Sequence, residues 1–193
     1  MAKGSRKSPS AWAQLNGRWQ ITGSNATYIG PNDPSSPLGL CLSSLPLRSG
    51  TVGVQARLSE GAIAARIVIG RNAATGTYYS IGLGGYDSAY VLSLFTPGRG
   101  WQAQEVGGAQ AQLSTNREYD IEVRILGQRV SLDVDGVRIF QVALPSPLQG
   151  DQVGLLHGAT DKLCSTTFTR QQTSQMFLSS CSSANLMTAY TGK

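Results

Sequence analysis

The sequence predicts an all-β fold of the sandwich or barrel type, and three observations carry this prediction. Short segments in which apolar and polar residues alternate recur from Leu38 to Arg170. Turn signals containing Gly, Pro or Asp-Gly separate these segments. In this span no apolar period of 3.6 residues persists for three turns. About ten to twelve short strands without helices are typical of a sandwich or barrel.

The first half of this span contains five predicted strands, and a glycine-rich stretch separates the last two. Alternate residues from Val52 to Leu58 fall on one face, which is the pattern of a half-buried strand. The five strands are LGLCLSSL at 38–45, GTVGVQARLSE at 50–60, AIAARIVIG at 62–70, TYYSIGLGG at 77–85 and AYVLSLF at 89–95.

The second half predicts a further series of strands and one tight hairpin. In EYDIEVRIL at 118–126, the charged residues Asp120, Glu122 and Arg124 alternate with apolar ones, so an outer and an inner face are expected. Asp135-Gly136 supplies the two residues with positive φ that a two-residue hairpin turn needs. The remaining strands are GQRVSLDV at 127–134, VRIFQVAL at 137–144, VGLLHG at 153–158 and CSTTFTR at 164–170.

Composition favours a single domain with polar ends. The chain has 193 residues, of which 14% are charged and 23 are glycines, and this suits a sheet protein with many turns. The formal net charge is +5, but Lys3, Arg6, Lys7 and Lys193 lie at the ends. The other 12 of the 16 basic residues stand beside 11 acidic ones and are scattered. Nucleic acid is therefore not expected as a partner.

The sequence gives no sign of membrane insertion or export. It has no run of about 18 apolar residues, and no apolar segment follows the basic residues at the N-terminus. The chain has three cysteines, Cys41, Cys164 and Cys181. Because this number is odd, we expect free thiols in a reducing compartment, with Cys41 buried in a strand. A cytoplasmic location follows as the expectation. A zinc site is not expected, because there is no CxxC spacing and His157 is the only histidine.

Three phrases follow one another in an order that a known superfamily shares. They are NGRWQITGSNATYIGP at 16–31, GTVGVQARLSEGAIAARIVIG with YYSIGLGGYDSAYVLSLF at 50–95, and YDIEVRILGQRVSLDVDGVRIFQVALPSPLQGDQVGLLHG at 119–158. In the last phrase a strand, a turn, a strand ending in Asp-Gly and a later Val-Gly-Leu strand recur in order. The pattern resembles the concanavalin A-like lectin/glucanase superfamily, in particular its laminin-G-like jelly-roll modules.

The resemblance implies a two-sheet antiparallel jelly-roll sandwich with one concave face, over residues 12–170. Residues 1–11 are then a flexible basic tail, and residues 171–193 a Ser/Thr-rich tail or the start of a linker. Members of the superfamily bind sugars, hydrolyse glycosides or bind proteins. The fold alone therefore does not decide the function, and the site has to be argued separately.

Glycoside hydrolysis requires two carboxyl groups on either side of one bond. Enzymes of the superfamily carry them in a Glu-x-Asp-x-x-Glu motif, which this chain lacks. Two acidic pairs are spaced at i, i+2 and so share a face of their strand: Asp120 with Glu122, and Asp133 with Asp135. A solvated outer face of each strand explains both pairs. The lone His157 in GLLHGAT is interpreted as a packed side chain and not as a catalytic base.

Calcium is the cofactor that the superfamily would allow, and no cofactor is expected from the residues themselves. The segment DVDGVR opens like an EF-hand loop but lacks the third acidic position and the Glu at position twelve. Asp87 and Asp161 are the remaining candidate ligands, and no cluster of ligand residues accompanies either in the sequence. We therefore predict no metal site.

The segment SIGLGGYDSAY at 80–90 is interpreted as a turn between two strands. A dinucleotide fingerprint would need Gly where Asp87 stands and a helix after it. A sugar site needs exposed aromatic rings beside short polar side chains, because sugars present apolar C–H faces and hydroxyl groups. The predicted ligand-binding residues are those that lie near turns, namely Tyr86, Asp87, Arg99 and Trp101. Tyr90 is expected in the core.

These observations favour a non-catalytic binding module that recognises a glycan or glycan-like ligand at the concave face or loop rim. Two alternatives stay open. One is an intracellular protein-interaction or sensor module formerly joined to a C-terminal effector domain, which the missing signal peptide and the tail after Arg170 favour. The other is an atypical glycoside hydrolase that lacks the usual motif.

Overall fold

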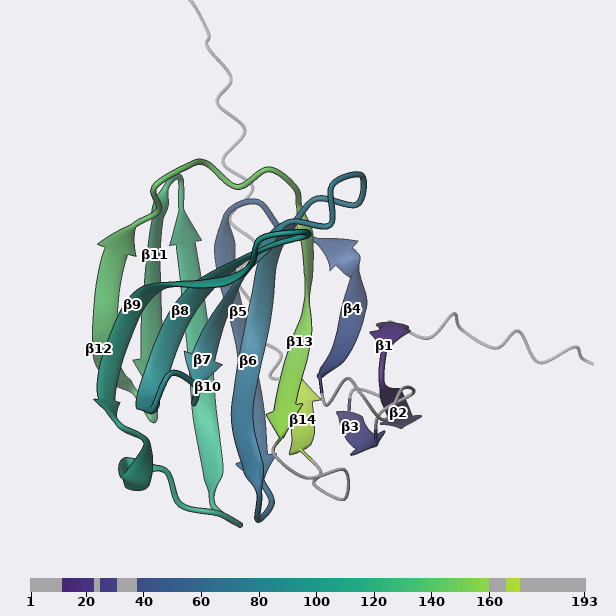
Figure 1. The fold of residues 1–193 in the computed structure, drawn as a ribbon, viewed down its shortest axis with the longest axis vertical. Helices are drawn as coiled ribbons and strands as arrows, with labels where there is room; N and C mark the ends of the chain where they lie inside the picture. Colours follow the sequence, from purple (N-terminus) through teal and green to yellow (C-terminus); the bar gives the residue numbers. More distant parts are fainter. Residues whose placement is uncertain (1–11, 23–24, 31–37, 160–165, 171–193) are drawn as a thin grey trace, which may run out of the picture.

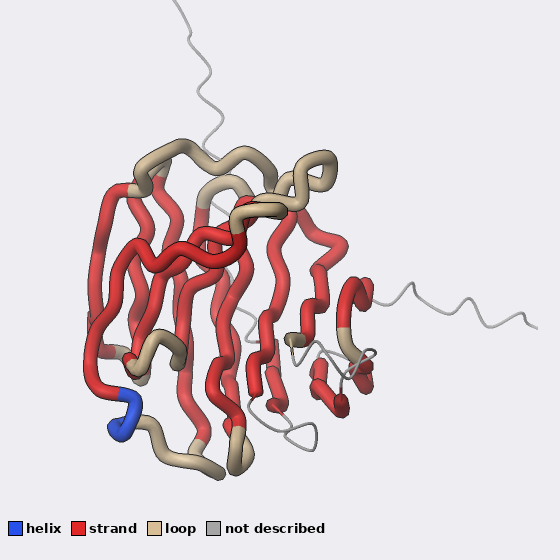
Figure 2. Tube along the Cα trace, viewed as in Figure 1, coloured by secondary structure: helices blue, strands red, loops and turns tan. Residues whose placement is uncertain are grey.

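The computed structural model describes residues 12–22, 25–30, 38–159 and 166–170, which form two antiparallel sheets packed against one another (Figure 1). Most of these residues lie in strands, and the one helical segment among them is a short 3₁₀ turn at Gln110–Gln112 (Figure 2). No helix in these ranges is long and apolar enough to cross a membrane. The predicted two-sheet antiparallel sandwich is confirmed.

Seven strands form each sheet among the described residues. Neighbours such as β4 and β13 are far apart in sequence, as the crossovers of a jelly roll require. Sheet A holds, in spatial order, β1 (Trp12–Asn16), β4 (Gly39–Pro46), β13 (Gln152–Ala159), β6 (Ala62–Arg71), β7 (Tyr78–Leu83), β8 (Ser88–Thr96) and β9 (Gly100–Ala109). Sheet B holds β12 (Val137–Ala143), β11 (Arg129–Val134), β10 (Glu118–Leu126), β5 (Gly50–Leu58), β14 (Thr166–Arg170), β3 (Asn25–Gly30) and β2 (Arg18–Thr22).

The predicted strands all appear, but the prediction of ten to twelve strands is too low for the fourteen that the described ranges contain. The additional ones are the short β1, β2 and β3 and the edge strand β9. Among the described strands β9 pairs with β8 alone, and all of its residues are half-buried or exposed. Its polar sequence GWQAQEVGGA therefore lacks the apolar alternation on which the prediction depended.

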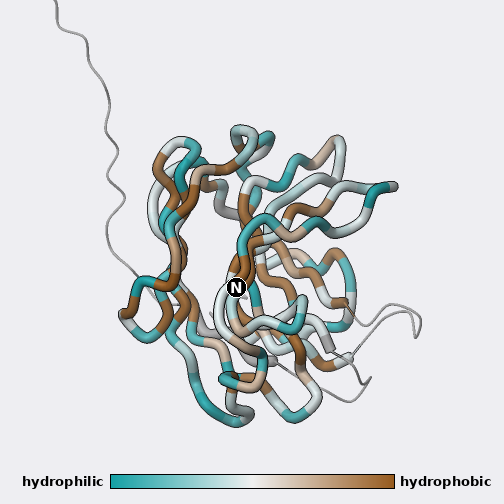
Figure 3. The backbone as a smooth tube through the Cα atoms, turned by 60° about the vertical axis from the view of Figure 1, so that its left-hand side comes forward, coloured by the Kyte–Doolittle hydropathy of each residue, from teal (hydrophilic) through white to brown (hydrophobic). Residues whose placement is uncertain are grey.

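The main core lies between the sheets and is filled by alternate residues of the strands. In β10, Tyr119, Ile121, Val123 and Ile125 are buried in it, and the residues between them face outward. Figure 3 shows the resulting succession of apolar and polar stretches along the chain. Tyr90 packs against this core, and Cys41 is buried within it, as the sequence predicted.

A second apolar cluster lies on the opposite, outer face of sheet A. Residues at alternate positions of β4, β6, β7 and β13 form it, and aromatic residues of β8 and β9 pack against it. Its members are Leu40, Leu42, Val68, Tyr78 and Leu156, with Phe95 and Trp101 at the side. The outer face of sheet A therefore carries an apolar cluster, whereas that of sheet B carries a row of charged residues.

Candidate functional site

Three aromatic rings meet on the outer face of sheet A, near the turn that joins β8 to β9. Tyr78 pairs with Phe95 across β7 and β8, and Phe95 pairs with Trp101 across β8 and β9. Residues in register on neighbouring strands place their side chains on the same face. The ring centroids of Phe95 lie 5.1 Å from Tyr78 and 4.9 Å from Trp101, and Tyr78 meets Trp101 edge-on at 5.6 Å. We call these three residues the aromatic patch.

A hollow of about 410 Å³ opens at the same end of the sheet, and Tyr78 belongs both to it and to the aromatic patch. Three segments distant in sequence border it: the loop between β6 and β7, the end of β8 with its turn, and the connection from β12 to β13. We call it the rim hollow. Its polar lining residues are Thr75, Thr77, Tyr78, Tyr79, Thr96, Ser146 and Gln149.

The lining can form hydrogen bonds with a neutral polar ligand. The hydroxyl groups of Tyr79 and Ser146 lie 3.1 Å apart and are hydrogen-bonded to one another. Burial raises the pKa of Tyr78 to about 12, so this phenol keeps its proton at neutral pH. Among the described residues that line the hollow, none is an Asp or a Glu. Uncharged donors and acceptors beside aromatic rings are the chemistry that this end of the sheet offers.

The four predicted ligand-binding residues fall at two opposite ends of sheet A. Trp101 belongs to the aromatic patch, and the exposed Arg99 lies in the adjoining turn, where its backbone N–H donates to the carbonyl of Thr96 at 3.0 Å. Tyr86 and Asp87 lie in the turn from β7 to β8, beyond the other end of β7. Five residue steps along β7 separate the ends by roughly 17 Å. The structure thus brings Arg99 close to Trp101 but does not bring Tyr86 and Asp87 to them.

The turn from β7 to β8 has an unusual backbone. Gly84, Gly85, Tyr86 and Asp87 all have positive φ, at 73°, 110°, 52° and 54°. The N–H of Ser88 donates to the Gly85 carbonyl at 3.0 Å, which closes a two-residue turn with Tyr86 and Asp87 at its centre. The positive-φ turn predicted for this stretch is confirmed, although two residues with side chains share it with the glycines. A bulky residue such as Tyr at positive φ is rare.

Arg66 lies beneath this turn and was not among the predicted site residues. Its side chain is 5% exposed, on the outer face of β6. Nε donates to the Gly84 carbonyl at 2.9 Å, and Nη1 donates to the hydroxyl groups of Ser80 and Ser93 at 3.3 and 3.0 Å. The Tyr86 ring centroid lies 6.0 Å from the guanidinium carbon. Burial lowers the pKa of Arg66 to about 10, which still leaves it charged at neutral pH.

The sequence did contain one signal for Arg66. It is the only charged residue in AIAARIVIG, and a charge inside a continuous apolar strand is expected to be held by specific hydrogen bonds. Among the described residues Arg66 has no carboxylate within ion-pair distance, and neutral oxygens accept its hydrogen bonds. Arg66 therefore anchors the turn from β7 to β8 on the outer face of the sheet.

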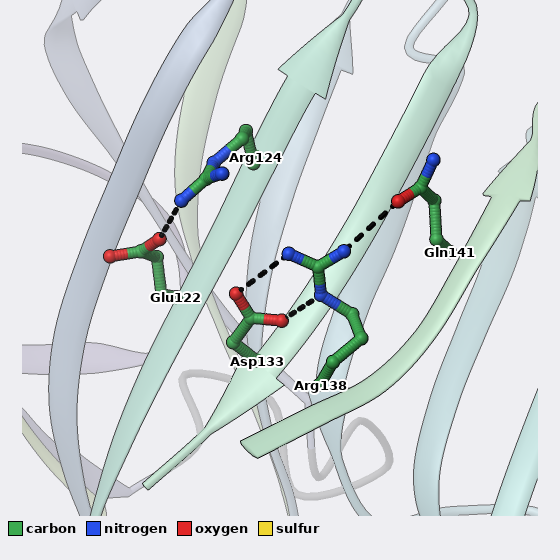
Figure 4. Close-up of polar contacts among 5 residues, drawn as sticks. All are labelled: Glu122, Arg124, Asp133, Arg138 and Gln141. Carbon is green, nitrogen blue, oxygen red and sulfur yellow. Dashed lines mark hydrogen bonds and ion pairs between the residues drawn. The ribbon is translucent and has the colours of Figure 1, made fainter. Parts of the chain in front are cut away.

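Of the two acidic pairs singled out as candidate glycosidase groups, three members lie on the outer face of sheet B, namely Asp120, Glu122 and Asp133, and Asp135 lies in the turn from β11 to β12. Glu122 accepts a hydrogen bond from Arg124 at 3.0 Å, and Asp133 accepts two from Arg138 (Figure 4). Each of these two carboxylates is thus held by an arginine on a sheet face that borders solvent. The arrangement agrees with the interpretation of a solvated outer face.

Asp135 stabilises its own hairpin. It has φ 52° and precedes Gly136, which has φ 76°, as the Asp-Gly turn predicts. One carboxylate oxygen accepts the backbone N–H of Asp120 at 2.9 Å, and the other accepts a hydrogen bond from Arg117 at 2.6 Å. These contacts give Asp135 a structural role.

His157 is buried in β13 and stacks on Tyr28, with ring centroids 4.0 Å apart. Burial lowers the pKa of His157 to about 3, so the imidazole is neutral at physiological pH and has no contact with solvent. The packed side chain expected from the sequence is what the structure shows. Within the described ranges no three His, Cys, Asp or Glu residues gather as metal ligands, and Asp161 lies outside those ranges.

Solved structures of similar shape exist at low sequence identity. The carbohydrate-binding module CBM66 from Bacillus subtilis matches with a TM-score of 0.66 and 16% identity, over 83% of this chain and 92% of that one. A β-glucanase from Bacillus licheniformis matches at 0.58 and 11%, over 86% and 92%. The catalytic domain of an endo-1,3-β-glucanase (laminarinase) from Thermotoga petrophila matches at 0.55 and 10%, over 85% and 90%.

These structures show that the chain has the antiparallel β-sandwich fold that they share. The fold that the resemblance in the sequence implied is thereby confirmed. No protein-family model and no curated protein matches the sequence. At 10–16% identity the structural likeness establishes the fold and leaves the activity open.

Proposed function

We propose that this protein is a carbohydrate-binding module that holds a neutral sugar unit in the rim hollow. The observation that carries the proposal is the combination of a 410 Å³ hollow lined by hydroxyl and amide groups with the aromatic patch at its side. A sugar presents hydroxyl groups around its rim and apolar C–H groups on its faces. The hollow would bind the former, and Trp101 and Phe95 would contact the latter in an adjoining unit.

Binding without hydrolysis is the form of the function that we propose. Hydrolysis of a glycosidic bond requires a pair of carboxyl groups close to the bond. The described residues lining the rim hollow supply none, and Glu122 and Asp133 are held by arginines on the other sheet. Similarity to the CBM66 module supports the same proposal, while the narrower likeness to laminin-G-like modules stays a prediction.

The test is a glycan array with the wild-type protein and three single variants. Thr77→Val removes one hydroxyl group from the hollow at nearly constant volume, and Trp101→Ala removes the ring of the aromatic patch. Tyr86→Ser is the matched control, because it removes an exposed aromatic ring at the opposite end of the sheet. Thermal unfolding of each variant verifies that it is folded.

We expect the wild-type protein to bind one class of neutral glycan. Thr77→Val and Trp101→Ala should each weaken that binding about tenfold, the loss expected when one well-placed polar or stacking contact is removed. Tyr86→Ser should leave it unchanged. Loss of binding in Tyr86→Ser alone would place the ligand at the other end of the sheet. Release of reducing sugar from the bound glycan would show that the protein hydrolyses its ligand, and would overturn the proposal of binding alone.

A further inference from the structure

The outer face of sheet B contains a second hollow, of about 180 Å³, centred on β11. The strand register defines its layout. Ser131 stands in the middle, with Arg124 of β10 opposite it on one side and Gln141 of β12 on the other. Arg129 lies two residues before Ser131 in β11, and its partner in β10 is Leu126. We call this hollow the basic hollow, and Arg138 completes its border.

The floor of the basic hollow holds an unused hydrogen-bonding group. Ser131 is 5% exposed and lines the hollow, and its hydroxyl forms no hydrogen bond with another described residue. The Ser131 hydroxyl is not among the buried atoms that lack a hydrogen-bond partner, so it is open towards the hollow and free to donate to a ligand. A ligand with acceptor oxygens placed over Ser131 would accept this hydrogen bond.

The border of the basic hollow carries more positive than negative charge. Arg124 and Arg138 are both exposed to solvent, yet their guanidinium groups are held in place by Glu122 and Asp133. Gln141 accepts a further hydrogen bond from Arg138 at 2.9 Å (Figure 4). Since each of these two carboxylates faces one arginine, the charge of Arg129 is left over; among the described residues it has no ion-pair partner.

Fixed guanidinium groups are suited to oxyanions. The planar fork of N–H donors in Arg matches the spacing of oxygens in a phosphate or sulfate group, and holding the fork in place reduces the entropy lost on binding. Two forks held in this way, together with the guanidinium of Arg129 and one hydroxyl donor, offer hydrogen bonds to several oxygens of one tetrahedral group. A neutral sugar has no need of this many cations.

We propose that the basic hollow binds a phosphate- or sulfate-ester group, with Ser131 as a donor at its floor and Arg124, Arg129 and Arg138 around it. The site lies on the opposite sheet from the rim hollow and does not depend on the function proposed there. The ester oxygens accept a hydrogen bond from Ser131 and balance the charge of Arg129.

The experiment is a titration of the full chain with sodium phosphate and with sodium sulfate, at ionic strength held constant with sodium chloride, followed through backbone amide shifts by NMR. Two variants remove parts of the site: Arg129→Gln removes the unpaired charge, and Ser131→Ala removes the floor hydroxyl. Arg57→Gln is the matched control. Arg57 lies in β5 of the same sheet, pairs loosely with Glu118 at 3.9 Å, and is outside the hollow.

We expect saturable binding of both anions, with the largest shifts at β10–β12. Arg129→Gln should raise the Kd about tenfold and Ser131→Ala about threefold, as expected for loss of a charged and a neutral hydrogen bond. Arg57→Gln should change the Kd less than twofold. Failure of both anions to saturate would overturn the site, and so would an equal loss in Arg57→Gln and Arg129→Gln, since that result means general charge screening.

The same titration with three sugars distinguishes a phosphate ester from a sulfate ester as the ligand. The sugars are glucose 6-phosphate, glucose 6-sulfate and unmodified glucose. We expect at least one ester to bind as tightly as its free anion and to compete with it, and glucose alone to give no shift at β10–β12. The ester that competes identifies whether phosphorylated or sulfated molecules are the natural ligands. Binding of the free anions without either ester would overturn the assignment to an ester group.

Discussion

The guanidinium of Arg66 is hydrogen-bonded through Nε and Nη2 to the carbonyl oxygen of Gly84, 18 residues later in the chain, and the Nε–O distance is 2.9 Å. This contact joins the middle of β6 to the turn that follows β7. That turn contains four residues with positive φ in succession, two of them with side chains. A backbone of this kind persists only where surrounding contacts hold it.

Replacing Arg66 with Lys should therefore destabilise the protein. The ammonium group keeps the charge but lacks the planar fork, so it cannot bond Gly84, Ser80 and Ser93 at once. We expect the free energy of unfolding in urea to fall by about 2 to 3 kcal/mol, the range for hydrogen bonds to a charged group. Arg57→Lys, at an exposed position, should change it by less than about 0.5 kcal/mol. Equal stability of the two variants would show that Arg66 does not hold the turn.

The strain in the turn can be measured at Asp87. Its φ of 54° costs an ordinary L-residue about 1 kcal/mol and costs Gly almost nothing. Both Asp87→Ala and Asp87→Gly remove the carboxylate, so their difference reports the backbone alone. We expect Asp87→Gly to be the more stable by about 1 kcal/mol, which is a rise of roughly 2 to 4 °C in the melting temperature at this chain length. The reverse order would mean that the turn does not keep this conformation in solution.

Much of the fold could be predicted because its strands alternate apolar and polar residues. Strand β10 is the clearest case, since Ile121 and Val123 are buried while Asp120 and Arg124 are exposed. The Asp135-Gly136 turn followed from local chemistry in the same way. Strand β9 could not be predicted, because an edge strand with solvent around it needs no apolar face.

The candidate site was harder to predict because it depends on which strand ends meet. Tyr86 and Trp101 are only 15 residues apart in the sequence, yet the length of strand β8 between them places them at opposite ends of sheet A. The rim hollow, in contrast, combines Thr77 with Ser146, which no local pattern connects. Only the order of strands in the sheet reveals such neighbours.

Cys41 should be inert towards thiol reagents in the folded protein. It is fully buried in β4, and burial raises the pKa of its thiol to about 12, so almost no thiolate exists at pH 8. The measurement uses the variant Cys164→Ser/Cys181→Ser, in which Cys41 is the only thiol. We expect no reaction with an aromatic disulfide reagent over minutes in buffer and one reacting thiol in 8 M urea. Rapid reaction without urea would indicate that β4 opens readily.

His157 makes the free energy of unfolding depend on pH. It is the only histidine in the sequence, so no other imidazole contributes to this dependence. The folded state holds it neutral, with a pKa of about 3, whereas an unfolded chain protonates it near pH 6.5. The pKa is lower in the folded state, so the contribution is fully present above pH 6.5. It is lost progressively as the pH falls towards 3.

Between pH 7.5 and pH 5.0 the free energy of unfolding should therefore fall by about 2 kcal/mol, since each pH unit below 6.5 costs at most about 1.4 kcal/mol for one proton. Urea unfolding at pH 7.5, 6.5, 5.8 and 5.0 measures this slope. In His157→Gln the slope over the same window should vanish, whatever the stability of that variant at pH 7.5, because no imidazole remains to bind the proton. An imidazole ring signal that titrates near pH 6.5 in the folded wild-type protein would contradict the buried neutral state, since stacking on Tyr28 with no exposed surface leaves no room for a solvated cation.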